Sequence, residues 1–311
     1  MELSPEEPRI LNFQKPVDHA ELTRTVRLFS SRYPFLHISS LGKSILGRDL
    51  PVLVLGNGRR QLLYVGAHHG MEWLTAAWLL RFVNEFCEYY RSGRTVYRVS
   101  LPVFWEQYTL HVIPMLNPDG VEYQQHGVDR QNPLFDRLVG MNGGSTDFSH
   151  WQANARGVDL NHNYDAGFSE YKKLETEAGI GNGAPTRFSG QEPESEPEVR
   201  ALCSYIRFLS DLRLVLTLHT QGEEIYYRSG GKLLPGSYQA ARKIAQLTSY
   251  RLSDAEGLAS YGGLTDWCIR KLGIPALTLE CGKGKNPLPL CDFFPVYARL
   301  REALFTAGRL C

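Results

Sequence analysis

The chain has 311 residues, of which 43% are hydrophobic and 22% charged, as in an ordinary globular protein. Its 34 basic and 33 acidic residues leave a formal charge of +1, so we expect neither nucleic acid nor an anionic membrane as a partner. The first residues lack a signal-peptide pattern, and no apolar run approaches the roughly 20 residues of a membrane helix. These features predict a cytoplasmic protein, with secretion by another route or association with a spore left open.

The six cysteines are scattered and form no CxxC pair; they are Cys87, Cys203, Cys268, Cys281, Cys291 and Cys311. Several lie in apolar stretches, where a free cysteine behaves as a small hydrophobic residue. We therefore expect reduced thiols, which fits a cytoplasmic chain. The pattern does not predict an oligomeric state.

Short runs rich in Val, Leu, Ile or Thr alternate along the chain with segments of helical periodicity. The predicted strands, in chain order, are 50–55, 61–67, 108–116, 212–218 and 276–281. The predicted helices are 73–90, 194–209, 238–250, 264–272 and 293–307. This alternation predicts an α/β fold with a largely parallel sheet covered on both faces. Without a repeat or a linker, residues 1–311 read as one domain, with residues 1–40 as a lead-in that packs on it.

Two long polar segments interrupt this alternation. Residues 124–155 and 166–192 are rich in Gly, Asn and Ser and exceed the usual loop length. Loops of that length are functional or mobile. In an open α/β fold we expect them to wall a cleft.

The sequence VGAHHGMEW (65–73) places His69 and Glu72 three residues apart, between a predicted strand and a predicted helix. A tight turn there can direct an imidazole and a carboxylate at one point, and catalytic zinc takes three such protein ligands. His68 competes with His69 by position, but only His69 has the three-residue spacing to Glu72. An HxxE spacing alone is weak evidence, because a surface histidine beside a capping glutamate has the same pattern.

Two further residues follow distant strands. His219 ends the run LVLTLH, and Glu280 ends ALTLE. The carboxyl ends of parallel strands meet at one edge of an open α/β sheet, where such folds bind ligands. We therefore predict His219 as the third zinc ligand and Glu280 as the general base that takes a proton from the attacking water.

Several motifs in order along the chain resemble those of the carboxypeptidase A-like zinc peptidase family. They are GKSILGRDLPVLVLG (42–56), GAHHGMEW (66–73), PMLNPDG (114–120), ARGVDLNHNYDAGF (155–168), SGQEPESEPE (189–198), LHTQGEEIYY (218–227), YGGLTDW (261–267) and TLECGKGKNPLP (278–289). The resemblance implies a mixed eight-stranded sheet flanked by helices, one zinc ion per chain, and hydrolysis by zinc-activated water. It places the ligands at His69, Glu72 and His219 and the base at Glu280. It also implies that Asp159 orients a ligand histidine.

One departure from the family pattern concerns the substrate. Carboxypeptidases of this family grip the terminal carboxylate of a peptide with an Asn-Arg pair, and here the pair is Asn161-His162. An imidazole cannot fork onto a carboxylate as a guanidinium does. The motif GVDLNHN together with ECGKGKNPLP is more similar to the γ-D-glutamyl-diamino acid endopeptidases, which cut the stem peptides of bacterial peptidoglycan.

A second departure affects the residues around the reacting carbonyl. Family members often carry a basic residue where Gln152 stands, so Gln152 or Arg156 is our candidate for stabilising the oxyanion. The tyrosine that closes over substrate in the family aligns near Leu258; Tyr261 could replace it, or it could serve only in packing. Thr265 matches the base of the pocket for the residue after the scissile bond, and it suits a polar side chain.

The leading hypothesis is a zinc peptidase that hydrolyses the bond between γ-D-glutamate and a diamino acid such as meso-diaminopimelate. A metallocarboxypeptidase that acts on ordinary peptides, with Arg130 or Arg137 binding the carboxylate, is the alternative. A non-catalytic module that binds wall peptides is a second alternative, which the intact set of ligands and Glu280 disfavours.

Overall fold

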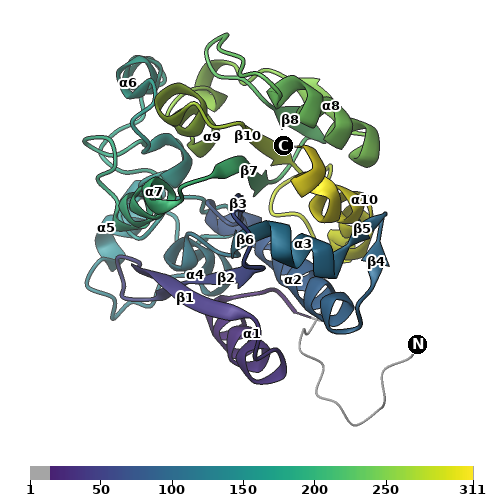
Figure 1. The fold of residues 1–311 in the computed structure, drawn as a ribbon. Helices are drawn as coiled ribbons and strands as arrows, with labels where there is room; N and C mark the ends of the chain where they lie inside the picture. The colour runs from purple at the N-terminus through teal and green to yellow at the C-terminus, as the bar shows by residue number, and fades with distance from the viewer. Residues whose placement is uncertain (1–14, 311) are drawn as a thin grey trace.

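The computed structural model describes residues 15–310, and its central feature is an eight-stranded sheet with the order β1-β2-β6-β3-β7-β10-β8-β9 (Figure 1). The inner strands β6, β3, β7 and β10 run parallel, whereas β1, β2 and β8 pair antiparallel with their inner neighbours. The predicted mixed, largely parallel sheet is therefore confirmed. Its strands are β1 (His37–Lys43), β2 (Asp49–Leu55), β3 (Arg60–Val65), β6 (Tyr108–Ile113), β7 (Leu212–His219), β8 (Glu224–Tyr226), β9 (Arg251–Ser253) and β10 (Ala276–Glu280).

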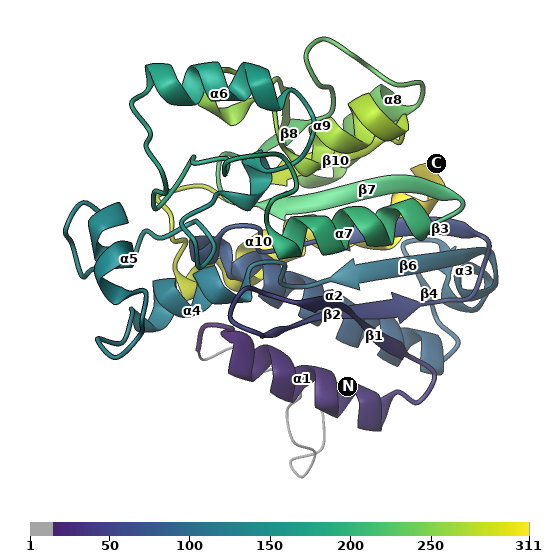
Figure 2. The same cartoon turned by 90° about the vertical axis from the view of Figure 1, so that its left-hand side faces the viewer.

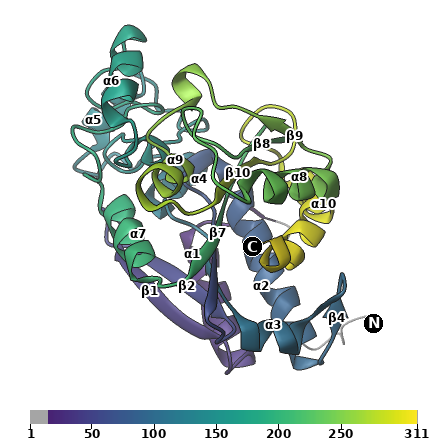
Figure 3. The same ribbon diagram turned by 45° about the horizontal axis from the view of Figure 1, so that its top comes forward.

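Helices cover both faces of this sheet. Figure 3 shows α7 on one side and α2 and α10 on the other, with β7 between them. The helices are α1 (His19–Arg32), α2 (Leu74–Arg91), α3 (Leu101–Gln107), α4 (Pro118–His126), α5 (Phe135–Met141), α6 (Phe168–Glu177), α7 (Pro197–Phe208), α8 (Ser237–Thr248), α9 (Leu264–Trp267) and α10 (Phe293–Thr306). A π-helical turn, Cys268–Leu272, continues α9, and a small hairpin joins β4 (Thr95–Val96) to β5 (Val99–Ser100). No described helix is long and apolar enough to span a bilayer.

Successive residues of a strand point to opposite faces of the sheet, and the two cores follow this rule. Leu62 and Tyr64 of β3 belong to the larger core, which α2 and α10 cover. Leu63 and Val65 belong to the core beneath α7 and α9. Because both faces are buried, the inner strands are nearly continuous apolar runs, which is why the sequence predicts them.

All five predicted strands and all five predicted helices are present with small shifts at their ends. The sequence reasoning missed α1, α3, α4, α5, α6, β1, β8, β9 and the hairpin. The edge strand β1 has no fully buried residue, so it lacks the apolar run of an inner strand. The five described cysteines are free, as expected; four are buried and Cys291 is exposed, while Cys311 lies outside the described residues.

The two long polar segments carry their own structure. They include α5 and α6, which lie with α4 beyond the end of the sheet toward which β6 points (Figure 2). The first segment and Tyr123 of α4 form a third small core, which also contains Leu138, Phe148 and Trp151. Both segments are thus anchored at the edge of the sheet where the inner parallel strands end.

Candidate metal centre and substrate pocket

The turn after β3 is shaped by close backbone packing. Ala67 has a left-handed φ of 46°, and a Cβ on Gly70 would lie 2.3 Å from the carbonyl oxygen of Gly120 in α4. Asn117 Nδ2 donates to the carbonyls of His68 and Gln152, both at 3.0 Å. Only glycine fits at position 70, because its backbone crosses α4 without space for a side chain. These contacts hold the segment that carries His69 and Glu72.

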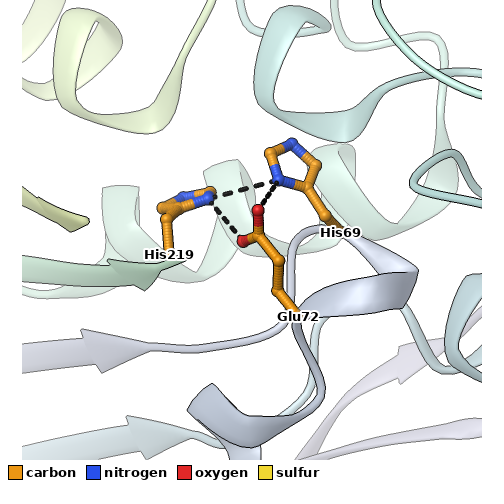
Figure 4. Close-up of side chains that lie close together, drawn as sticks. All are labelled: His69, Glu72 and His219. Carbon is orange, nitrogen blue, oxygen red and sulfur yellow. Dashed lines mark hydrogen bonds and ion pairs between the residues drawn. The ribbon is translucent and has the colours of Figure 1, made fainter. Parts of the chain in front are cut away.

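The side chains of His69, Glu72 and His219 converge at one point (Figure 4), with one nitrogen or oxygen of each within 4.8 Å of the others. Glu72 Oε1 lies 2.9 Å from His69 Nδ1, and Glu72 Oε2 lies 3.0 Å from His219 Nδ1. The two Nδ1 atoms are 3.4 Å apart. His219 comes from the end of β7, so residues 147 or more positions apart meet as the sequence predicts.

This donor set fits a zinc ion. Two imidazoles and one carboxylate are the ligands of many catalytic zinc sites, which keep a further position open. A divalent cation would also relieve the close approach of the two ring nitrogens, since both Nδ1 lone pairs can then point at it. We take His69, Glu72 and His219 as the residues that would hold the metal.

Asp159 lies behind His69. Its Oδ1 accepts a hydrogen bond from His69 Nε2 at 3.0 Å, and its Oδ2 accepts one from the backbone N–H of Arg187 at 3.0 Å. Burial alone would raise the pKa of Asp159, but His69 and His162 outweigh it and hold that pKa far below its ordinary value. A carboxylate that accepts from Nε2–H leaves Nδ1 free to bind a metal, which is the role expected for Asp159.

Glu72 and Glu280 have opposite electrostatic environments. Burial would raise the pKa of Glu72, but His69 and His219 outweigh it and lower that pKa to about 2. Burial and the charge of Glu72 raise the pKa of Glu280 well above its ordinary value. Two neighbouring carboxyl groups with divergent pKa values are typical of a site that pairs an ionised ligand with a group that exchanges protons.

The metal-binding cluster opens into a cavity of about 320 Å³. His69, Glu72 and Glu280 line it, and the first and second long segments contribute Gln152, Thr186 and Arg187. The expectation that these segments wall a cleft is therefore confirmed.

Four residues predicted to bind substrate line this cavity: Gln152, Asn161, His162 and Thr265. Gln152 Oε1 accepts a hydrogen bond from the Thr186 hydroxyl, so its Nε2 remains as a donor. His162 stacks on Tyr171, with ring centroids 3.9 Å apart, and donates from Nδ1 to the Tyr261 carbonyl. The hydroxyls of Thr265 and Thr278 are 2.7 Å apart, which makes this part of the wall polar.

Other candidates lie outside the cavity. The Arg156 side chain is 49% exposed, lies 3.7 Å from Glu196 and does not line the cavity. The Tyr261 ring lies beside the Arg270 guanidinium, 5.6 Å from its carbon, and Leu258 lines the cavity instead. Arg130 and Arg137 also fall outside its lining.

His68 is not part of the metal-binding cluster. Its Nε2 lies 3.0 Å from the Tyr164 hydroxyl, and its Nδ1 lies 3.4 Å from that of Thr217. Burial lowers the pKa of His68 well below its ordinary value, so the ring is neutral. The structure therefore excludes His68 as the competing ligand.

The sequence reasoning missed two arginines that line the cavity. Arg228 forms a bidentate ion pair with Asp254. Arg187, by contrast, is exposed, and among the described residues its contact with a carboxylate is the backbone hydrogen bond to Asp159. Arg187 is distant from Asp159 in sequence and is held beside it by a backbone hydrogen bond. No local sequence pattern would therefore have identified Arg187 as a residue of the cavity.

An open α/β sheet with a His-Glu-His donor set at its strand ends, beside a carboxyl of raised pKa and a polar cavity, is typical of a metal-dependent hydrolase. Comparison with known families agrees: residues 22–303 match the model described as zinc carboxypeptidase. The chain belongs to this family, so it is a zinc metallopeptidase.

Individual relatives support this assignment. Gamma-D-glutamyl-L-diamino acid endopeptidase 1 of Lysinibacillus sphaericus is 31% identical over 302 residues, which cover 96% of this chain and 74% of the relative. Carboxypeptidase A from Helicoverpa armigera superposes with a TM-score of 0.73 at 19% identity, covering 96% of this chain and 74% of that one. Murein-tripeptide amidase from Escherichia coli O157 gives a TM-score of 0.53 at 21% identity, covering 86% and 91%. The two solved structures show a shared fold.

Proposed function

We propose that this peptidase hydrolyses the amide bond between the γ-carboxyl of D-glutamate and a diamino acid, such as meso-diaminopimelate, in peptidoglycan stem peptides. The observation that carries the proposal is the 31% identity, over nearly the whole chain, to a relative named for that activity. His162 supports it, because it lines the cavity at the position where the family's carboxypeptidases have an arginine.

The γ-linkage changes which charges flank the bond to be cut. D-glutamate joined through its γ-carboxyl keeps a free α-carboxylate, which an ordinary α-linked residue lacks at that place. Arg187 lines the cavity and contacts a carboxylate of the described residues through its backbone N–H, and a guanidinium binds a carboxylate with two parallel hydrogen bonds. We assign Arg187 to this substrate carboxylate.

The reaction is the addition of water to the amide carbonyl followed by cleavage of the carbon–nitrogen bond. Zinc, when bound, supplies a Lewis acid that polarises the carbonyl and acidifies water. Glu280 takes one proton from the attacking water and later gives it to the leaving nitrogen of the diamino acid. The products are the free γ-carboxyl and the free amine, so atoms and charge balance.

Negative charge develops on the carbonyl oxygen as water adds. Gln152 keeps its Nε2 as a donor toward the cavity because its Oε1 accepts from Thr186. A neutral donor at such a position typically contributes about 100-fold or more in rate. We assign this role to Gln152, since Arg156 faces Glu196 and not the cavity.

The test uses purified protein loaded with zinc and three peptides: L-Ala-γ-D-Glu-meso-diaminopimelate, its α-linked isomer, and an ordinary peptide with a free C-terminus. Mass spectrometry of the products identifies the bond that is cut. We expect cleavage of the γ-linked peptide alone. Release of C-terminal residues from the ordinary peptide, with the γ-linked one intact, would overturn the proposal in favour of a metallocarboxypeptidase.

A wall-peptide binding module is the other outcome. It would bind the γ-linked peptide without cutting it, and Glu280→Gln would leave that binding unchanged. An enzyme carrying the same substitution keeps zinc and substrate but loses turnover.

A further inference from the structure

We propose that His68 is a positioning residue for the zinc ligand His219 and acts on it through the hydroxyl of Thr217. The proposal rests on the zinc site described above but not on the identity of the substrate.

Four side chains form a continuous series of hydrogen-bonding contacts. His219 Nε2 lies 3.1 Å from Thr217 Oγ1, which lies 3.4 Å from His68 Nδ1. His68 Nε2 in turn lies 3.0 Å from the Tyr164 hydroxyl. All four residues are at most 1% exposed, so no solvent competes for these bonds. The rings of His68 and His219 also stack, with centroids 5.2 Å apart and planes at 28°.

The local geometry explains why these residues meet. Thr217 and His219 are two positions apart on β7, so both side chains point to the same face of the sheet. That face also packs Tyr164 in the core beneath α7 and α9. The left-handed turn at Ala67 lets consecutive histidines diverge, so that His69 joins the metal-binding cluster and His68 enters this core.

A metal at this site would be compatible with one arrangement of the ring and hydroxyl protons along this series of hydrogen bonds. His219 Nδ1 faces Glu72 and would keep its lone pair for the metal, which would place the ring proton on Nε2. That N–H donates to Thr217 Oγ1, and the Thr217 hydroxyl then donates to Nδ1 of His68. The His68 proton is left on Nε2, where the Tyr164 oxygen accepts it. Each ring nitrogen of His68, and Nε2 of His219, then has a hydrogen-bond partner.

The consequence is that each ligand histidine has a hydrogen-bond partner at Nε2, on the side of the ring away from the metal, and the two partners differ. Asp159 accepts directly from His69 Nε2, whereas the hydroxyl of Thr217, itself oriented by His68, accepts from His219 Nε2. Loss of such a supporting partner typically weakens metal affinity about 10- to 100-fold.

The experiment measures the zinc dissociation constant by competition with a chromophoric chelator, using full-length protein. Thr217→Val keeps the shape of the side chain and removes the hydroxyl, and we expect zinc binding about 10- to 100-fold weaker. Thr217→Ser should restore affinity. His68→Phe keeps an aromatic ring but removes the Nδ1 acceptor, and it should weaken binding in the same direction. The visible spectrum of the Co²⁺-substituted protein should shift in both weakened variants.

Thr25→Val is the matched control, because Thr25 is fully buried in α1 and its hydroxyl has no hydrogen-bond partner in the described chain. It should leave zinc affinity and the Co²⁺ spectrum unchanged. Wild-type affinity in both Thr217→Val and His68→Phe would overturn the proposal, as would equal losses in Thr25→Val. No substrate enters the measurement, so its result is independent of whether the γ-linked peptide is cleaved.

Discussion

Glu198, in the first turn of α7, offers a test of the buried electrostatics away from the metal. Its side chain is fully buried, with Oε1 accepting from the Ile45 N–H at 3.2 Å and Oε2 without a partner among the described residues. Burial, reinforced by Asp119 and Glu196, raises the pKa of Glu198 from 4.5 to about 7. The folded protein therefore binds this proton more tightly than the unfolded chain does.

The sign of the effect follows from this difference. Below pH 4.5 the group is protonated in both states and has no effect on the pH dependence of stability. As the pH rises toward 7, the unfolded chain ionises first, so the free energy of unfolding falls. Proton linkage gives a loss of about 2.5 kcal/mol between pH 5 and pH 8 from this one group.

The assay is urea unfolding of the wild type and of Glu198→Gln, each at pH 5 and pH 8. Glutamine keeps the acceptor for Ile45 but cannot ionise. The difference in free energy of unfolding between the two proteins is compared at pH 5 and pH 8. Any effect of the substitution that does not depend on pH cancels in this comparison. We expect the variant to gain about 2.5 kcal/mol relative to the wild type from pH 5 to pH 8. An equal difference at both pH values would refute the raised pKa.

Further variants test the site. Glu280→Gln should lower kcat by about 100- to 10,000-fold while zinc content, measured by atomic absorption, stays at one per chain. Arg187→Ala should raise KM for the γ-linked peptide about 10-fold or more, and should change KM much less for the same γ-linked peptide with its glutamate α-carboxylate amidated; equal losses on both would contradict the carboxylate assignment. Asp159→Asn should weaken zinc binding about 10- to 100-fold in a chelator competition, and unchanged affinity would remove its orienting role. Removing zinc with a chelator should abolish hydrolysis, and adding zinc back should restore it. Full hydrolysis by the zinc-free protein would contradict a zinc-dependent reaction.

The sheet could be predicted where physics leaves a strong local signal. β3, β6, β7 and β10 are buried on both faces, so each is an apolar run. Strand β8 and the edge strand β9 have only three residues each, too few for any periodicity. Helix α1 did carry a signal that the reasoning overlooked, since the Asp18 side chain caps it by accepting from the Glu21 N–H.

The site was predictable only in part, because only some of its residues lie at the ends of strands or helices. His69, Glu72, His219 and Glu280 follow strands or precede a helix, and a strand end has a known place in an α/β sheet. The side chains on long loops do not follow from such rules. Arg187 reaches the cavity because its backbone bonds to Asp159, and Tyr261 is turned toward Arg270 in a left-handed conformation. Both depend on contacts between distant segments.

The wall of the cavity formed by the first long segment rests on a small core of Tyr123, Leu138, Phe148 and Trp151, separate from the two cores of the sheet. It joins the metal-bearing turn through the Gln152 carbonyl, which accepts from the Gly70 N–H at 2.9 Å. The segment that forms this wall of the cavity therefore packs largely separately from the turn that carries His69 and Glu72. Exchanging this wall for that of a relative, with Gln152 kept, is a direct route to altering what the enzyme accepts without rebuilding how it binds zinc.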